Sequence, residues 1–160
     1  MSRKKHPYGI VDPSIIPETA DKILDDFFQI TEQLKIRSCL AAGLCLGFVR
    51  DGGYIDGDND LDVVAICVGD KKDKLINTLK EHNFSLGRSF PPPHNNAHFH
   101  KDKILIDIFF REAKRFYSEF ESVQYKGKLY PIPSPIGEYL STCYTNWKIK
   151  EDEVIHYWDG

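Results

Sequence analysis

Aspartates are crowded into one short stretch of the chain, residues 51–62, which reads DGGYIDGDNDLD. The stretch passes directly into the apolar run VVAI at 63–66, which has the composition of a buried strand. Side chains alternate between the two faces of a strand, so Asp60 and Asp62 point the same way while Leu61 points the other way. Two carboxylates this close repel each other unless a positive charge lies between them. The spacing therefore indicates an acidic site at the beginning of a strand.

A third carboxylate, that of Asp107, lies inside the apolar segment 104–110, ILIDIFF. A carboxylate in such surroundings is costly to bury unless it is paired, protonated or bound to a metal. If this segment is a strand beside the first one, Asp60, Asp62 and Asp107 converge. Carboxylate oxygens are the ligands that Mg²⁺ or Mn²⁺ prefers, and such an ion would neutralise charge on a reacting phosphoryl group. The alternative interpretation is a solvated acidic loop, with Asp107 held by a lysine or a backbone amide.

The elements that must position these acids alternate between helix and strand patterns. Apolar residues recur at helical spacing over 19–37 and 70–83, and 44–49 has room for one or two helical turns. Strand patterns cover 39–42 and 61–68, a hairpin formed by 97–100 and 104–110, and a second hairpin formed by 123–125 and 129–132. Three prolines make 91–96 a loop, and Ser134-Pro135 begins a last helix that ends near Tyr144. This order predicts an α/β (α+β) fold with a mixed sheet flanked by helices.

Length and composition indicate one globular domain. In 160 residues we expect an N-terminal arm over 1–17 and a single domain over 18–160. The formal net charge of −3 does not favour nucleic-acid binding. The sequence shows neither a transmembrane run nor a signal-peptide pattern, so the expected location is cytoplasmic. The four cysteines lack metal-ligand spacing and are predicted to be small buried hydrophobic residues.

The segment 43–62 resembles a motif of the LicD/fukutin-type phosphotransferases, which have a nucleotidyltransferase fold of the polymerase-β type. In that family Gly-Thr-Leu-Leu-Gly-x-x-Arg-x-Gly-Gly leads into Ile-Pro-Trp-Asp-Asp-Asp-Ile-Asp, and here GLCLGFVRDGG at 43–53 leads into YIDGDNDLD at 54–62. The segment 106–109, IDIF, resembles a later strand of the family, and 133–147 resembles its Pro…Leu…Tyr-Gly-x-x-Trp segment. The resemblance extends from about Cys39 to Trp147.

The resemblance implies a role for each matching residue. Asp60, Asp62 and Asp107 look like catalytic carboxylates and metal ligands, and one of them would also help to deprotonate the acceptor hydroxyl. Asp58 would bind a second metal or a metal-bound water. Two glycines, Gly43 and Gly47, would let the backbone approach a phosphate, and Arg50 would pair with phosphate oxygens or brace the acidic loop.

Three histidines, at 94, 98 and 100, precede the segment that contains Asp107. His98 and His100 share one strand face, where we expect them to contact substrate phosphate or accept a proton. A zinc site and a plain polar face of an edge strand are the alternatives.

Three functions follow from these observations. The resemblance implies a Mg²⁺-dependent transferase that moves a phosphocholine-like or ribitol-phosphate-like group from a CDP-activated donor to a glycan hydroxyl. Other proteins of the same fold transfer a nucleoside monophosphate from an NTP to a small molecule or a protein. The third function is a degenerate domain that binds a nucleotide or a partner without turnover. Two departures from the family pattern support it, Leu44 at the position of the hydroxyl residue and Asn59 at the position of the middle aspartate.

Overall fold

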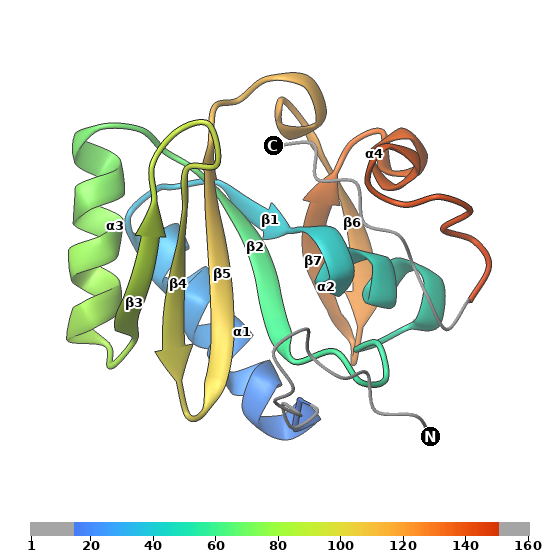
Figure 1. The fold of residues 1–160 in the computed structure, drawn as a ribbon, viewed down its shortest axis with the longest axis horizontal. Helices are drawn as coiled ribbons and strands as arrows, with labels where there is room; N and C mark the ends of the chain where they lie inside the picture. The colour runs from blue at the N-terminus through green and yellow to red at the C-terminus, as the bar shows by residue number, and fades with distance from the viewer. Residues whose placement is uncertain (1–14, 151–160) are drawn as a thin grey trace.

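A five-stranded sheet forms the centre of the computed structural model, which describes residues 15–150 (Figure 1). The strands are β1 (Ser38–Leu40), β2 (Asp60–Ile66), β3 (Ser85–Phe90), β4 (Asn96–Lys101) and β5 (Ile104–Arg111). Their order in the sheet is β1-β2-β5-β4-β3. β2 and β5 run parallel, whereas the other neighbouring pairs are antiparallel. The predicted mixed sheet is therefore confirmed.

The register of β2 on β5 brings the predicted carboxylates to one place. Asp62 lies opposite Asp107, and Asp60 lies opposite Leu105. Residues that lie opposite each other on neighbouring strands point to the same face of the sheet. The three aspartates consequently share one face, and the apolar residues between them, such as Leu61 and Ile106, point to the other.

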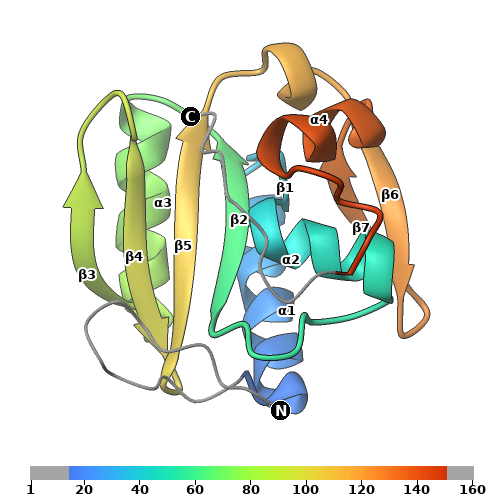
Figure 2. The same ribbon diagram turned by 45° about the vertical axis from the view of Figure 1, so that its right-hand side comes forward.

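Two helices, α1 (Pro17–Gln33) and α3 (Asp70–Glu81), cover the face opposite the aspartates (Figures 1 and 2). The inward residues of α1 include Ile23, Leu24 and Phe27, which are fully buried. They belong to one hydrophobic core with Leu61, Phe99 and other apolar residues of the sheet. Burial of each large side chain contributes about 1.5–3 kcal/mol, so this layer holds the sheet rigid beneath the acids.

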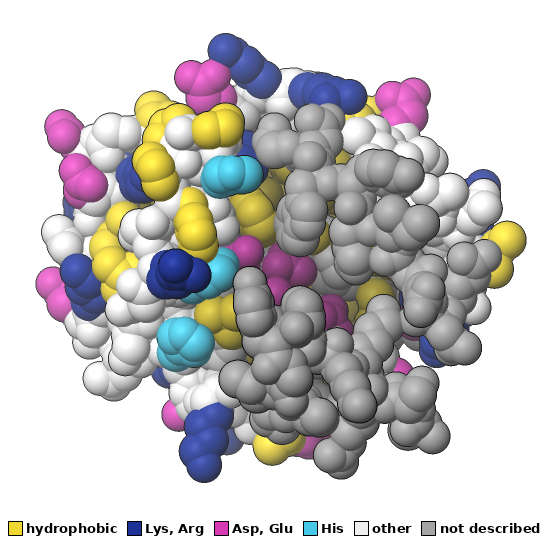
Figure 3. Space-filling view, viewed as in Figure 1, with side chains coloured by type: hydrophobic (Ala, Val, Ile, Leu, Met, Phe, Trp, Pro, Cys, Tyr) yellow, Lys and Arg dark blue, Asp and Glu magenta, His cyan; other side chains and the backbone are white. Residues whose placement is uncertain are grey.

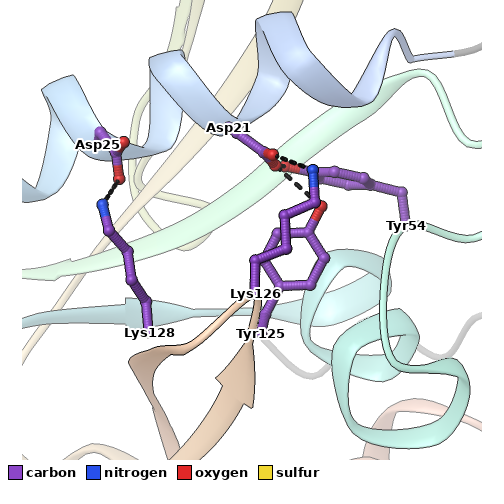
Figure 4. Close-up of polar contacts among 6 residues, drawn as sticks. All are labelled: Asp21, Asp25, Tyr54, Tyr125, Lys126 and Lys128. Carbon is purple, nitrogen blue, oxygen red and sulfur yellow. Dashed lines mark hydrogen bonds and ion pairs between the residues drawn. The ribbon is translucent and has the colours of Figure 1, made fainter.

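The remaining elements lie beside β1. They are α2 (Ala42–Leu46), the π-helix η1 (Gly47–Asp51), the 3₁₀ helix η2 (Arg115–Tyr117), a hairpin of β6 (Phe120–Tyr125) and β7 (Lys128–Pro133), and α4 (Ile136–Cys143). Polar contacts tie the hairpin to α1 (Figure 4). Asp21 accepts hydrogen bonds from Tyr54 (2.6 Å), Tyr125 (3.0 Å) and Lys126 (2.8 Å). Burial raises the pKa of Asp21, but the three donors outweigh it and the pKa is lowered overall.

The structure differs from the sequence-based prediction at several element boundaries. β3 was not predicted, because SLGRSF lacks an apolar alternation and becomes a strand through its pairing with β4. The first helix ends at Gln33 rather than at 37, and Lys35 just beyond it has a left-handed φ of 55°. Pro135 is the cap that precedes α4, not its first residue. Residues 1–14 of the predicted arm lie outside the described residues, and Pro17 is already the first residue of α1.

The sequence predicted that the cysteines are small buried residues and that the chain has no transmembrane run. Cys39, Cys45 and Cys67 are buried, Cys143 is half-buried, and all four are free thiols. Over residues 15–150, the helices are too short or too polar to cross a bilayer.

Candidate functional site

Four aspartates gather on one face of the sheet where β2 begins. Asp60 and Asp62 come from β2, Asp107 comes from β5, and Asp58 comes from the loop before β2. Asp62 is 4% exposed and Asp107 is 7% exposed. Carboxylates are visible at the centre of this face, with histidines beside them (Figure 3). The structure therefore brings together the three residues that the sequence predicted as catalytic carboxylates, along with Asp58.

Burial and mutual repulsion raise the pKa of two carboxylates in the cluster, those of Asp62 and Asp107. Burial, followed by repulsion from Asp60, Asp58 and Asp107, raises the pKa of Asp62 well above its ordinary value, although the backbone N–H of Gly43 opposes the shift. Asp62 Oδ1 is buried and has no hydrogen-bond partner within the described residues. Burial also raises the pKa of Asp107, and the hydrogen bond from Asn96 and the nearby His98 only partly offset it. A cation at this position would relieve both groups.

A divalent metal suits this donor set, although the side chains do not already surround one. Within residues 15–150, no group of three or more His, Cys, Asp or Glu side chains is arranged to hold a metal ion. The buried, unpartnered Asp62 Oδ1 and the raised pKa of Asp62 and Asp107 nevertheless fit a bound cation. The donors are all carboxylate oxygens, which suit Mg²⁺ or Mn²⁺ better than zinc.

Gly43, in the first turn of α2, lies directly against the acids. A Cβ atom at this position would be 3.0 Å from Asp58 Oδ2, 3.6 Å from Asp62 Oδ2 and 3.8 Å from Tyr144 Oη. The N–H group of Gly43 donates to the Asp62 carboxylate. A side chain here would therefore displace the Asp58 carboxylate, and the predicted contact of Gly43 with a substrate phosphate stays a prediction.

Replacing Gly43 with alanine is expected to impair the acidic site more than the fold. The added methyl group would press on the Asp58 carboxylate at 3.0 Å and occupy space between α2 and Asp62. If the acids bind a metal–nucleotide complex, its affinity should fall about tenfold or more, because disturbing the groups that orient metal ligands typically costs about 10–100-fold. Gly137→Ala in α4 is the matched control, since its added Cβ would meet nothing within 4 Å. Equal nucleotide affinity in the two variants, measured by calorimetry, would contradict the expectation.

Gly47 and Arg50 have structural contacts that explain them without a substrate. A Cβ at Gly47 would approach Gly53 O to 2.5 Å, so the residue allows two backbone segments to touch. Arg50 forms a two-point ion pair with Asp51, through Nε at 2.8 Å and Nη2 at 3.0 Å. Its Nη1 donates to the carbonyl oxygens of Trp147 (3.4 Å) and Ile149 (3.5 Å). Arg50 thus braces the segment around η1, and the phosphate roles of both residues remain predictions.

The two predicted histidines lie at different distances from the acids. His98 lies opposite Asp107 in the sheet, with Nε2 3.5 Å from Asp107 Oδ2, and its ring packs edge-on against Phe90 at 5.0 Å. His100 is exposed and lies opposite Leu105, with its ring next to Gly87. His98 is therefore placed to take part in the acidic cluster, whereas His100 lies farther along β4.

Two further residues belong to the site. The sequence predicted Asn96 as part of a loop, and Tyr144 as the end of the last helix within the segment 133–147 that resembles the family. Asn96 Nδ2 donates to Asp107 Oδ1 at 2.8 Å, and both side chains are buried. Tyr144 is buried, and its Oη lies 3.8 Å from the position that a Cβ on Gly43 would take, beside the cluster. Burial, followed by the charge of Asp62, raises the pKa of Tyr144. Asn96 ends a run of loop residues and Tyr144 follows a helix, so neither position shows a local pattern that points to the acids.

A separate cavity of about 390 Å³ opens at the carboxyl ends of β2 and β5. Aromatic rings and two arginines line much of it: Phe110, Phe116, Tyr117, Tyr139, Arg111 and Arg115. None of the four aspartates lines it. Because a strand rises by roughly 3.3 Å per residue, Asp107 and the cavity residue Arg111 are about 13 Å apart along β5. The cavity therefore neighbours the acidic cluster without including it.

The protein has a nucleotidyltransferase fold. Its mixed sheet is backed by helices, a glycine-bearing turn follows β1, and the carboxylates lie on β2 and β5. The antibiotic-resistance factor ANT(2'')-Ia has this fold in solution, with a TM-score of 0.58 and 10% identity over 74% of this chain and 67% of that chain. Its crystal structure with adenylyl-2''-tobramycin gives a TM-score of 0.55 and 10% identity, over 72% and 70% of the two chains. TM1012 from Thermotoga maritima, assigned as a nucleotidyltransferase, gives a TM-score of 0.56. It is 13% identical to this chain, and the match covers 79% of this chain and 84% of TM1012. The sequence matches no protein-family model and no curated protein.

Proposed function

We propose that the protein is a Mg²⁺- or Mn²⁺-dependent nucleotidyltransferase, which transfers a nucleoside monophosphate from an NTP to a hydroxyl group of a small acceptor. The observation that carries the proposal is the buried, unpartnered Asp62 oxygen beside Asp60 and Asp107 on a nucleotidyltransferase sheet. The structure of ANT(2'')-Ia with adenylyl-2''-tobramycin supports an acceptor of the hydroxyl-bearing, sugar-like kind.

Each carboxylate has a proposed task. Asp60, Asp62 and Asp107 hold the ion, which when bound neutralises charge on the phosphate oxygens. The acceptor oxygen attacks the α-phosphorus, the bond from that phosphorus to the bridging oxygen breaks, and pyrophosphate leaves. One of these three carboxylates also accepts the proton of the attacking hydroxyl. Asp58 orders the loop before β2, since its Oδ1 accepts a hydrogen bond from the N–H of Asn59 at 3.1 Å.

The aromatic cavity would hold an organic part of a substrate. Ligands of open α/β sheets commonly bind beyond the carboxyl ends of parallel strands, and β2 and β5 are the parallel pair here. The volume of about 390 Å³ and the ring-rich lining are typical of small-molecule sites. A base or sugar in this cavity would lie within reach of a phosphate at the acids, given the separation of about 13 Å along the strand.

The second candidate function is phospho-alcohol transfer from a CDP-activated donor to a glycan hydroxyl. The resemblance of segment 43–62 to the LicD/fukutin-type motif favours it. The chemistry would use the same three carboxylates but would release CMP in place of pyrophosphate. A cytoplasmic location and a non-catalytic nucleotide-binding role also remain predictions.

A panel of four NTPs, CDP-choline and CDP-ribitol, with and without Mg²⁺, separates these functions. We expect at least one NTP to raise the thermal unfolding midpoint by a few degrees only with Mg²⁺, because a ligand of the native state stabilises it. With sugar and amino-sugar acceptors present, that NTP should yield pyrophosphate. Release of CMP from a CDP-alcohol would favour the second function, and binding without any product would favour the non-catalytic one. A panel with no Mg²⁺-dependent shift would contradict the proposal.

A further inference from the structure

Asp107 is held by a neighbour on β4 that carries no charge. Asn96 Nδ2 donates a hydrogen bond to Asp107 Oδ1 at 2.8 Å, and Asn96 is only 8% exposed. Asn96 lies opposite Phe109, two residues beyond Asp107, so the bond crosses diagonally between β4 and β5. The second oxygen, Oδ2, is 3.5 Å from His98 Nε2, a contact too long for a strong hydrogen bond. One oxygen of Asp107 is therefore committed to Asn96, and the other is the better placed to meet a ligand.

The hydrogen bond from Asn96 can counteract the repulsion between Asp60 and Asp107. Asp60 and Asp107 carry like charges on neighbouring strands, so an unrestrained Asp107 carboxylate would rotate away from Asp60. A buried amide can restrain it without adding charge that would compete with a cation. Hydrogen-bond partners of this kind orient the ligands of metal sites, and their loss typically weakens metal binding about 10–100-fold.

We propose that Asn96 is a positioning residue, which fixes the rotamer of Asp107 so that Oδ2 faces a divalent cation shared with Asp60 and Asp62. The inference rests on the proposed function, because it assumes that the acidic cluster binds a metal. It adds a residue from β4, so the metal site draws on three adjacent strands, β2, β5 and β4.

Asn96→Leu tests the inference, because leucine is branched at Cγ like asparagine, although larger, and cannot donate a hydrogen bond. We expect the dissociation constant for Mn²⁺, measured by calorimetry and by electron paramagnetic resonance on the full chain, to rise about tenfold or more. In the metal-free variant, three-bond couplings of Asp107 should show averaging between rotamers, whereas the wild type should show one rotamer. Asn96→Gln retains an amide donor and should recover part of the Mn²⁺ affinity. If the leucine variant does not fold, Asn96→Ala replaces it, because alanine also removes the hydrogen-bond donor and is smaller than asparagine.

The matched control is Thr31→Val, which also removes buried hydrogen bonds. Thr31 Oγ1 donates to Phe28 O at 3.1 Å and lies 2.9 Å from Ser38 Oγ, on the helix-covered side of the molecule. It should lose stability yet bind Mn²⁺ within twofold of the wild type. Unchanged Mn²⁺ affinity and a single Asp107 rotamer in Asn96→Leu would overturn the positioning role while leaving the proposed function intact. A wild-type protein that does not bind Mn²⁺ would overturn both.

Discussion

Replacing Asp62 with asparagine is expected to abolish the proposed nucleotidyl transfer and, at the same time, to stabilise the metal-free protein. Asparagine keeps the size of the side chain and can still accept the N–H of Gly43, but it removes a negative charge from the most buried point of the cluster. We expect activity to fall about 10³-fold or more, since charge stabilisation by a bound ion contributes several kcal/mol. Relief of burial and repulsion should add about 1–3 kcal/mol to the free energy of unfolding near neutral pH.

The pH dependence of the free energy of unfolding follows from the raised pKa of Asp62. The pKa of Asp62 is raised in the folded protein, so between the unfolded and folded pKa values the native state binds more protons than the unfolded state. The free energy of unfolding of the metal-free wild type should therefore fall as pH rises through that window, starting near the ordinary carboxyl pKa of about 4. Asp62→Asn should flatten this slope. Asp21, whose pKa is lowered, contributes in the opposite sense and loses its stabilisation only as pH falls toward acid.

Urea unfolding of the metal-free proteins at pH 5 and pH 8, together with product assays, checks both effects. Asp102→Asn is the matched control, because it makes the same chemical change at an exposed hairpin turn where the backbone φ of 50° suits asparagine. The control should retain activity and keep the slope of stability against pH. An Asp62→Asn protein that is active, or that is less stable than the wild type at pH 8, would show that the Asp62 carboxylate neither binds the metal nor destabilises the metal-free cluster.

Replacing Phe48 with alanine is expected to lower the free energy of unfolding by several kcal/mol. Phe48 is 2% exposed and connects η1 to the β6–β7 hairpin. Its ring stacks on Tyr125 at 4.4 Å and makes edge contacts with Tyr54 at 5.3 Å and Tyr130 at 5.6 Å. Removing a buried phenyl ring typically costs about 3–5 kcal/mol, which for a chain of this size lowers the unfolding midpoint by roughly 10 °C.

Differential scanning calorimetry provides the measurement, and two further variants calibrate it. Phe48→Leu retains most of the volume and should lose less than half as much stability. Leu129→Ala truncates a side chain that is 70% exposed on the same hairpin, so its unfolding midpoint should stay within about 2 °C of the wild type. If Phe48→Ala unfolded at the wild-type temperature, the ring contacts of Phe48 with Tyr125 and Tyr130 would not be what joins η1 to the hairpin.

Local patterns in the chain were sufficient to predict the elements that carry the acids. Alternation on β2 placed Asp60 and Asp62 on one face, and the apolar run around Asp107 predicted β5, because side-chain direction along a strand depends only on the backbone of that strand. Three prolines likewise predicted the loop before β4. β3 was missed because its residues show no such periodicity, and its conformation is set by pairing with β4.

Contacts between distant segments could not be predicted in this way. The register that sets Asp62 opposite Asp107, the hydrogen bond from Asn96, and the bonds from Arg50 to the carbonyl oxygens of Trp147 and Ile149 each depend on where distant segments lie after folding. The network around Asp21 joins residues up to 105 positions apart, and the aromatic cavity is lined from several elements. The sequence by itself thus determined which residues carry the charge and which way they face along their own strands. Only the tertiary structure decided which of them meet, because strand order and side-chain packing are set by the burial of the whole core and not by any single segment.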